Sequence, residues 1–236
     1  MKLTLVRNAT LILETSDRRI LVDPMLDDAG ARPPIEDTPN QLANPLVPLP
    51  FPPERVVSGI DGAIVTHLHR DHLDGRAEEL LDRALPILTQ PGSLAELRAR
   101  GFDAATDEPD GWLGLEVALT PGRHGTGELG EALGPVCGFV LDGVYVAGDT
   151  IWCDEVRESI ERHRPRAIVV NGGGARFLEG DPIVMTAADV RALRSATDAT
   201  VVVVHLEAIN HCLERRDVYR AIDGVVVPDD GESLEL

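Results

Sequence analysis

Hydrophobic and polar positions alternate along the first part of the chain and predict short β-strands. The alternation occurs in three segments separated by turn-forming residues such as Asn8, Ser16 and Asp17. A period of two places successive side chains on opposite faces of a sheet. The pattern therefore predicts an opening meander of three strands, at residues 3–6, 10–13 and 19–22.

The rest of the chain alternates short apolar runs with segments of helical period. Strands are expected at residues 62–65, 87–89, 117–119, 137–141, 144–147, 167–170, 201–204 and 225–227. Helices are expected at residues 76–83, 93–100, 153–163, 186–196 and 213–222. Asp142 and Gly143 supply a hairpin turn between two of the strands. In each half the strands come first and helix–strand alternation follows, which predicts an α/β (α+β) protein with two sheets and helices packed outside them.

A proline-rich segment, residues 24–53, interrupts this pattern with neither a helical nor a strand period. Loops of about thirty residues are uncommon inside a compact domain and are usually functional or disordered. The apolar stretch LVPLPF argues against disorder. The segment is therefore expected either to cap a pocket as a lid or to present a surface to a partner.

Length and charge narrow the class of protein. The 236 residues can bury a substantial core, and a single domain over residues 1–236 is expected. Asp and Glu number 40 against 22 Lys and Arg, for a formal net charge of -18. Because phosphate binding depends on basic side chains, this charge argues against nucleic acid as a partner. No apolar run approaches the roughly 20 residues that span a bilayer, so no membrane partner is expected.

The cysteines and the N-terminus indicate the compartment. Cys137, Cys153 and Cys212 are odd in number, widely spaced and outside any CxxC pair, so they do not indicate a disulfide framework. The first residues lack the basic-then-apolar layout of a signal peptide. A cytoplasmic protein is expected, with no prediction of its oligomeric state.

Potential metal ligands crowd into the stretch THLHRDHLDG, directly after the apolar strand at residues 62–65. His67 and His69 lie two apart on an extended chain, so their side chains project the same way and can share one metal ion. Asp71 and His72 lie beyond the turn and can face a second ion. Imidazole and carboxylate suit zinc, manganese or iron. The alternative interpretation is a polar loop whose Asp74 caps the following helix.

THLHRDHLDG resembles the HxHxDH signature of the metallo-β-lactamase-fold hydrolases. Within them the chain looks most similar to the single-domain branch of ascorbate-6-phosphate lactonase-like proteins. The resemblance covers most of the chain, including ILVDP, and implies a four-layer αββα sandwich. It also implies three more ligands, each after a strand: His124 in PGRHGTG, Asp149 in GVYVAGDT and His205 in VVVVHLEAINH. Alone, these three have other interpretations, as a solvated histidine, a helix cap and a buried core histidine respectively.

The complete ligand set implies a hydrolase with two divalent metal ions per chain, zinc first, with manganese or iron as alternatives. The expected roles are His67, His69 and His124 on the first ion, Asp71, His72 and His205 on the second, and Asp149 as the bridge. A metal-bridging hydroxide would attack a small ester, lactone or phosphodiester. Asp71 would orient that hydroxide and serve as the catalytic residue.

Contacts to a small-molecule substrate are expected from loops that follow strands. Asn171, Gly173 and Arg176 lie in NGGGAR, where backbone N–H groups or the guanidinium can meet an anion; the alternative for the glycines is an ordinary exit from a strand into a loop. Glu207 and His211 closely follow His205 and can contact the substrate or orient the ligand. Two alternatives stay open: a non-catalytic metal-binding or assembly protein of the same fold, and a metal-dependent nuclease. The flavodiiron reductases fit less well, since their HxExD pattern has a carboxylate where this chain has a histidine.

Overall fold

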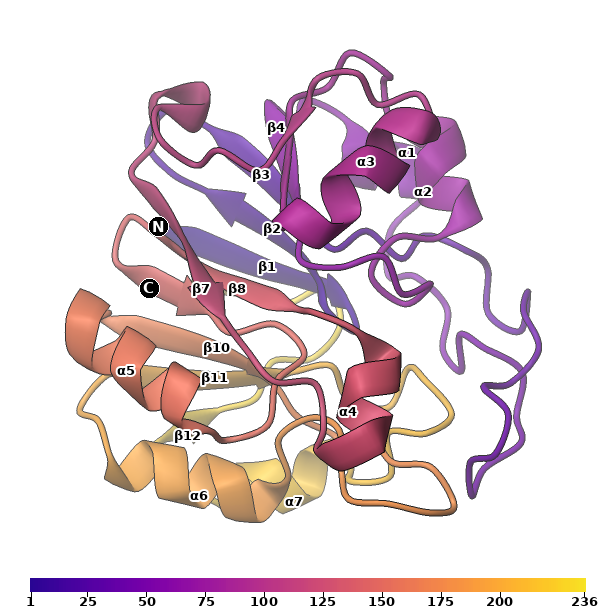
Figure 1. Ribbon diagram of the computed structural model, residues 1–236, viewed down its shortest axis with the longest axis vertical. Helices are drawn as coiled ribbons and strands as arrows, with labels where there is room; N and C mark the ends of the chain where they lie inside the picture. Colours follow the sequence, from indigo (N-terminus) through magenta and orange to yellow (C-terminus); the bar gives the residue numbers. More distant parts are fainter.

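Two β-sheets pack face to face in the computed structural model, which describes residues 1–236 (Figure 1). The N-terminal sheet has seven strands in the order β13-β1-β2-β3-β4-β5-β6. They are β1 (Lys2–Arg7), β2 (Thr10–Glu14), β3 (Arg19–Val22), β4 (Gly62–Val65), β5 (Ile87–Thr89), β6 (Ala105–Thr106) and β13 (Ser233–Glu235). The opening strands form the predicted antiparallel meander, and β3 to β6 run parallel.

The C-terminal sheet has six strands in the order β12-β11-β10-β9-β8-β7. They are β7 (Val117–Pro121), β8 (Cys137–Leu141), β9 (Val144–Val146), β10 (Ala167–Asn171), β11 (Thr200–Val204) and β12 (Val225–Val226). β8 and β9 form the predicted hairpin, with Asp142 and Gly143 both at positive φ, 46° and 74°. β9 to β12 run parallel.

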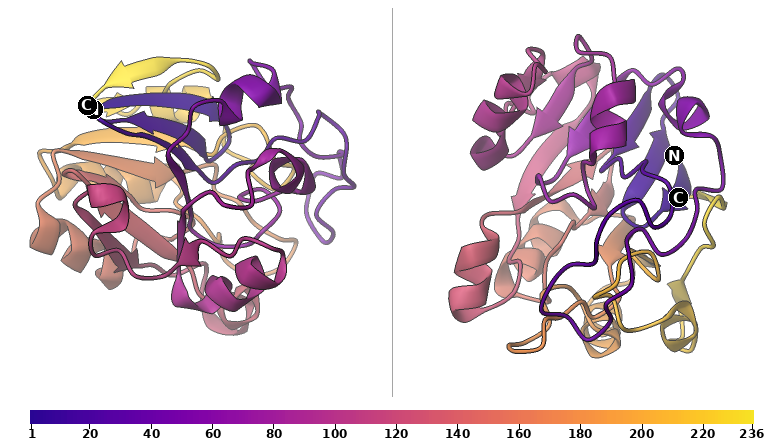
Figure 2. Two further views of the ribbon diagram at one scale, coloured as in Figure 1. Left: turned by 90° about the horizontal axis from the view of Figure 1, so that it is seen from above. Right: turned by 90° about the vertical axis from the view of Figure 1, so that its right-hand side faces the viewer.

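Helices cover the outer face of each sheet (Figure 1; Figure 2). The N-terminal sheet carries α1 (Pro53–Val57), α2 (Gly75–Leu80) and α3 (Pro91–Ala99), and the C-terminal sheet carries α5 (Asp154–His163), α6 (Ala187–Ser195) and α7 (Arg216–Arg220). α4 (Gly127–Leu133) and a 3-10 turn, Trp112–Gly114, lie in connections. These four layers confirm the predicted αββα sandwich. No helix has both the length and the apolar character needed to cross a membrane.

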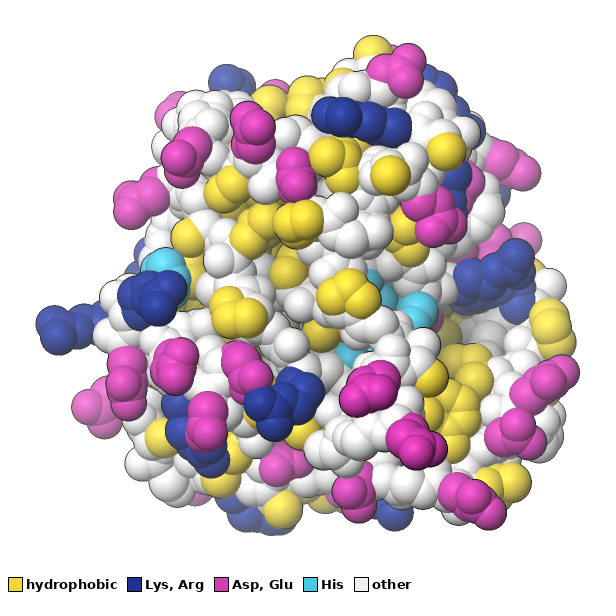
Figure 3. Space-filling model, viewed as in Figure 1, with side chains coloured by type: hydrophobic (Ala, Val, Ile, Leu, Met, Phe, Trp, Pro, Cys, Tyr) yellow, Lys and Arg dark blue, Asp and Glu magenta, His cyan; other side chains and the backbone are white.

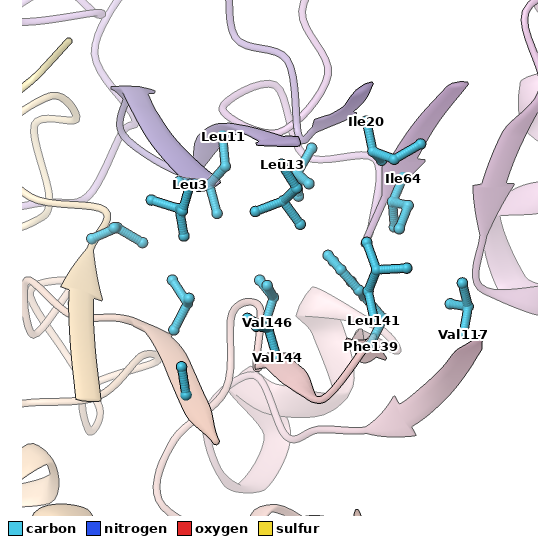
Figure 4. Close-up of a cluster of buried hydrophobic side chains, with 14 of the residues drawn as sticks. Leu3, Leu11, Leu13, Ile20, Ile64, Val117, Phe139, Leu141, Val144 and Val146 are labelled. Atoms are coloured by element: carbon cyan, nitrogen blue, oxygen red, sulfur yellow. The ribbon is translucent and has the colours of Figure 1, made fainter. Parts of the chain in front are cut away.

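The core between the sheets follows from the period of two. Leu11 and Leu13 of β2 point toward the opposite sheet, whereas Ile12 between them packs under the helices. From the C-terminal sheet, Phe139 and Leu141 of β8 point back into the same layer (Figure 4). Burying such side chains contributes roughly 1.5–3 kcal/mol each, so this layer fixes how the two sheets face each other.

The proline-rich segment is fastened to the N-terminal sheet by one buried arginine. Arg7, at the end of β1, is fully buried and donates to the carbonyls of Val47, Met25 and Asp27 at 3.0, 2.8 and 2.9 Å. Burial lowers the pKa of Arg7 to about 10, so its guanidinium is still charged at neutral pH. A sequence pattern that reads as loop is therefore held in one position by side-chain contacts.

Arg7→Met is expected to lower the free energy of unfolding by about 3–5 kcal/mol, because the carbonyls that it serves would lose their donor inside the protein. Urea denaturation followed by circular dichroism measures the change. Arg191→Met, at an exposed position of α6, is the matched control and should stay within about 0.5 kcal/mol of wild type. A loss below about 1 kcal/mol at Arg7 would contradict the anchoring role.

Candidate metal centre

The strands that run parallel end at one edge of the sandwich and deliver polar residues there. Thr66 to Asp74 follow β4, His124 follows β7, Asp149 follows β9 and His205 follows β11. β7 also runs in the direction of β9, since each pairs antiparallel with β8. Residues separated by up to 138 positions in the sequence can therefore meet at this edge.

The histidines expected on a first metal ion gather into one group. His67, His69 and His124 each offer a nitrogen, and these nitrogens lie within 4.8 Å of one another. His67 Nε2 is 3.0 Å from His69 Nδ1. His67 and His124 are buried, and His69 is partly exposed.

The residues expected on a second ion, Asp71, His72 and His205, form another group together with the expected bridge, Asp149, and the ligand atoms of these four also lie within 4.8 Å of one another. Asp71 Oδ2 lies 3.2 Å from His205 Nε2 and 3.7 Å from His72 Nε2. All four side chains are buried. The structure thus brings all seven of the ligand candidates together in the two groups expected from the sequence.

Asp149 faces both groups. Its Oδ2 atom lies 3.7 Å from His124 Nε2 and 4.0 Å from His67 Nε2 in the first group, and 3.2 Å from His72 Nε2 in the second. Its Oδ1 atom lies 3.7 Å from His205 Nε2. A carboxylate so placed can contribute to either group or to both.

The histidine rings are oriented as metal ligands would be. Four of them have Nδ1 against an outer partner: Thr66 Oγ1 for His67 (3.1 Å), Asp23 Oδ2 for His72 (2.8 Å), Ile183 O for His124 (2.9 Å) and Cys212 Sγ for His205 (3.4 Å). Outer partners of this kind fix the tautomer and turn the other nitrogen toward the metal. Here that nitrogen is Nε2, which faces the carboxylates in each case.

One nitrogen of the site has the environment of a metal ligand. His72 Nε2 is buried and has no hydrogen bond of acceptable geometry, although Asp149 Oδ2 lies 3.2 Å away. A buried polar atom without a partner costs about 1–3 kcal/mol, and it is rare in folded proteins. A divalent ion would use this lone pair together with the adjacent carboxylates. The donor set of imidazole and carboxylate suits zinc, manganese or iron.

Burial and neighbouring charges together shift the pKa values of the histidines and carboxylates in the site. Burial lowers the pKa of His67 well below its usual value. Burial also opposes a charge on His72 and His205, but the carboxylates, Asp149 foremost, outweigh it and raise the pKa of both. For Asp71 and Asp149, burial is likewise outweighed by the histidines, His72 foremost, which hold the pKa of both carboxyls well below the usual range. Both carboxylates are therefore ionised at neutral pH.

Asp23 is a member of the site that the sequence analysis did not single out. It is buried, and its carboxylate accepts from the backbone N–H and the hydroxyl of Thr66, both at 2.8 Å, in addition to its contact with His72. Its φ of 43° is unusual for a residue other than glycine. Backbone strain of this kind persists where the surroundings enforce it, often at functional sites. The available signal was Asp-Pro directly after β3, the strand that pairs with β4.

Part of the site opens onto a cavity of about 450 Å³, lined in part by His69, Asp71, His124 and Asp149. Its other walls are largely apolar and come from the proline-rich segment, from the loop after β4 and from loops of the C-terminal sheet; they include Pro33, Pro34, Ile35, Leu68, Phe177 and Ile209. In Figure 3, histidine side chains reach the surface beside a hollow with hydrophobic side chains. The proline-rich segment thus forms a wall of this cavity.

The substrate-contact candidates are distributed differently. His211 lines the cavity. Asn171 is buried and donates from Nδ2 to Asp149 Oδ1 at 2.6 Å, which places it behind the carboxylate. Gly173, Arg176 and Glu207 lie outside the lining: the Gly173 N–H donates to the Tyr219 hydroxyl, Arg176 is exposed, and Glu207 pairs with Arg216 at 2.7 Å.

Comparisons with known proteins agree with this arrangement. The profile of the beta-lactamase superfamily domain matches residues 18–206. The UPF0173 protein YddR of Bacillus subtilis is 35% identical over 251 aligned positions, which cover 99% of each chain. The crystal structure of an isothiocyanate hydrolase from Delia radicum gut bacteria is 35% identical, with a TM-score of 0.92 over 100% of this chain and 99% of that one. A possible metal-dependent hydrolase from Veillonella parvula is 30% identical, with a TM-score of 0.94 over the same shares.

Proposed function

This chain belongs to the beta-lactamase superfamily and is a metal-dependent hydrolase, and we propose that it binds two divalent ions and hydrolyses a small electrophile of the isothiocyanate class. The observation that carries the proposal is the pair of histidine–aspartate groups beside one cavity, with Asp149 facing both. The full-length similarity to an isothiocyanate hydrolase supports the substrate class.

The positions of the seven ligand candidates assign each of them a role in the proposed reaction. Two bound divalent ions would lower the pKa of a water molecule and polarise the group that it attacks. His67, His69 and His124 would hold one ion, Asp71, His72 and His205 the other, and Asp149 would reach both. Asp71 opens onto the cavity as an ionised carboxylate, so it can accept a proton there.

The cavity can hold a small substrate with an apolar organic group. An isothiocyanate has an electrophilic carbon between nitrogen and sulfur. Addition of one water molecule gives a thiocarbamic acid, which separates into an amine and carbonyl sulfide. A largely apolar cavity of about 450 Å³ can hold the organic group of such a molecule. The net charge of -18 disfavours a nucleic acid or a large phosphodiester.

We further propose zinc as the ion, because imidazole and carboxylate ligands suit it. We also propose the cytoplasm as the location, which the three unpaired buried cysteines support.

The test is turnover of a substrate panel by protein loaded with zinc, manganese or ferrous iron. The panel contains benzyl isothiocyanate, a phenyl ester, a small lactone and a phosphodiester. We expect benzyl isothiocyanate to be consumed with release of benzylamine, and Asp149→Ala to lose at least about 100-fold of that rate. Turnover of the lactone or phosphodiester, without turnover of the isothiocyanate, would show that the substrate class is wrong.

Lowering the pH is expected to release bound metal. A coordinating imidazole must be neutral, so protons compete with the ion. His72 and His205 have raised pKa values in the metal-free chain, so they take up protons above the usual histidine range and should release their ion first. We expect release from the second group to begin at or above about pH 6.5, and release from the first group, where burial lowers the pKa of His67, to need a lower pH. Dialysis at stepped pH with elemental analysis measures it, and full metal content at pH 5 would contradict the expectation.

A further inference from the structure

We propose that Arg32 and His211 form a hydrogen-bond-donor subsite in the cavity, which binds the electron-rich atom of the substrate, the sulfur in an isothiocyanate. The inference deepens the proposed function and rests on it, because the cavity must receive the substrate. Neither residue belongs to the two ligand groups, and both line the cavity beside Asp71 and Asp149.

His211 has unused hydrogen-bonding capacity. Its side chain is buried, with 5% of the residue exposed, yet Nδ1 has no hydrogen-bond partner. Native structures rarely leave such a buried atom unpaired without a reason. In either tautomer the neutral ring carries one N–H. Because His211 lines the cavity, a bound ligand could pair with its ring after a small adjustment of the side chain.

Arg32 has a guanidinium that is held from one side and free on the other. Nε lies 2.9 Å from the Asp27 carboxylate, and Nη1 donates to the Arg70 carbonyl at 2.8 Å. Nε and Nη2 are both buried, and neither makes a hydrogen bond of acceptable geometry. The ion pair with Asp27 and the hydrogen bond from Nη1 hold the group in place, so Nη2 is an unused donor on a positively charged group.

One hydrogen-bond network fixes the two donors relative to each other. Arg32 and Asn44 exchange backbone hydrogen bonds, each at 2.8 Å. The Asn44 side chain donates to Asn210 Oδ1 at 2.7 Å and accepts from the Asn210 backbone N–H at 2.9 Å. Asn210 directly precedes His211, whose carbonyl accepts from Arg176 N at 3.1 Å. The proline-rich segment and the loop after β11 therefore position the subsite jointly.

The charged and polar groups that line the cavity determine which kind of ligand atom it can bind. The only carboxylates that line the cavity are Asp71 and Asp149, which belong to the ligand groups. Asn44 is occupied by Asn210, so the wall offers the Arg32 guanidinium as a donor and the His211 ring, which donates through whichever nitrogen carries its proton. They match an acceptor atom that becomes more negative during the reaction, as the sulfur does when water adds to the adjacent carbon. Donors aimed at developing charge stabilise the transition state more than the bound substrate, and so raise kcat.

The experiment uses the metal-loaded full-length protein and two variants, His211→Ala and Arg32→Lys. The second variant removes Nη2 but keeps a positive charge near Asp27. We expect kcat for benzyl isothiocyanate to fall about 10- to 100-fold in each variant, with little change in KM. Titration with sodium thiocyanate, a linear anion with an accessible sulfur, should show about tenfold weaker binding. Added imidazole should restore part of the activity of His211→Ala, and metal content should equal that of wild type.

The controls are His163→Ala and Arg191→Lys, the same changes outside the cavity, which should match wild type; His211→Gln replaces His211→Ala if that variant does not fold. Unchanged kcat and thiocyanate affinity in both cavity variants would overturn the subsite while leaving the hydrolase intact. Loss of metal in His211→Ala would also overturn it, because the residue would then support the metal centre. If wild type hydrolyses no isothiocyanate but thiocyanate binding still depends on Arg32 and His211, the subsite holds and the proposed substrate is wrong.

Discussion

Asp71→Asn is expected to lower kcat by about 10²- to 10⁴-fold, the range of an enzyme that loses its general base. The change keeps the shape of the side chain but removes its charge and its capacity to take up a proton. Asp71 is the ionised carboxylate whose Oδ2 lies 3.2 Å from His205 Nε2, and it lines the cavity. The other carboxylate of the cavity lining is Asp149, which faces both ligand groups. No further carboxylate lines the cavity that could replace Asp71.

Asp71→Asn can lower kcat by removing the proton acceptor or by weakening metal binding. Measuring the metal content distinguishes these two causes. Steady-state kinetics is measured with and without excess metal, together with elemental analysis. If the carboxylate takes the proton, the loss persists when the variant carries as much metal as wild type. Asp103→Asn, the same change at an exposed position, is the control and should leave kcat unchanged. A value of kcat within about tenfold of wild type at full metal content would contradict the role of Asp71.

Asp23→Asn is expected to weaken metal binding at the second group by about 10- to 100-fold. Asp23 accepts from His72 Nδ1 at 2.8 Å and from Thr66, and so holds the ring with its Nε2 lone pair toward the centre. Asparagine would present an NH₂ group to at least one of these donors. The imidazole would then favour the tautomer with its proton on Nε2, which cannot bind a metal ion.

Competition with a metal chelator measures this effect, because it reports affinity without needing a substrate. We expect the chelator to remove one ion per chain from Asp23→Asn at a lower concentration than from wild type. The other ion should be affected less, because Asp23 reaches His67 only through the Thr66 hydroxyl. Identical chelator titrations of Asp23→Asn and wild type would show that Asp23 does not orient His72.

The ligand candidates could be found from the sequence because each follows a strand that is visible as an apolar run. GAIV precedes THLHRDH and VVVV precedes His205, so local pattern and chemistry coincide. Asp23 also follows a visible strand, but its role, like those of Arg32, Asn171 and Cys212, could not be found in this way. They depend on side-chain contacts between distant segments, such as Asp23 with His72 and Asn171 with Asp149.

The elements that the sequence did not predict are short or depend on tertiary context. β13 is three residues long and is defined by pairing with β1 at the other end of the chain, Lys2 opposite Glu235. α1 and α4 are short helices without a clear apolar period. α7 is shorter than the helix expected at residues 213–222. The reason is that the backbone N–H of Glu214 donates to the Gly173 carbonyl, and the Glu214 carboxylate accepts from the Tyr219 hydroxyl at 2.6 Å. Those contacts keep the preceding residues in a turn.

Metal content per chain tests the two-ion centre most directly, measured by elemental analysis of wild type, His124→Ala and His205→Ala. The two variants each remove one ligand from a different group. The arrangement predicts about two ions in wild type and about one in each variant. One ion in wild type, or complete loss of metal from both variants, would show that the seven residues form a single site and would contradict the two-ion centre.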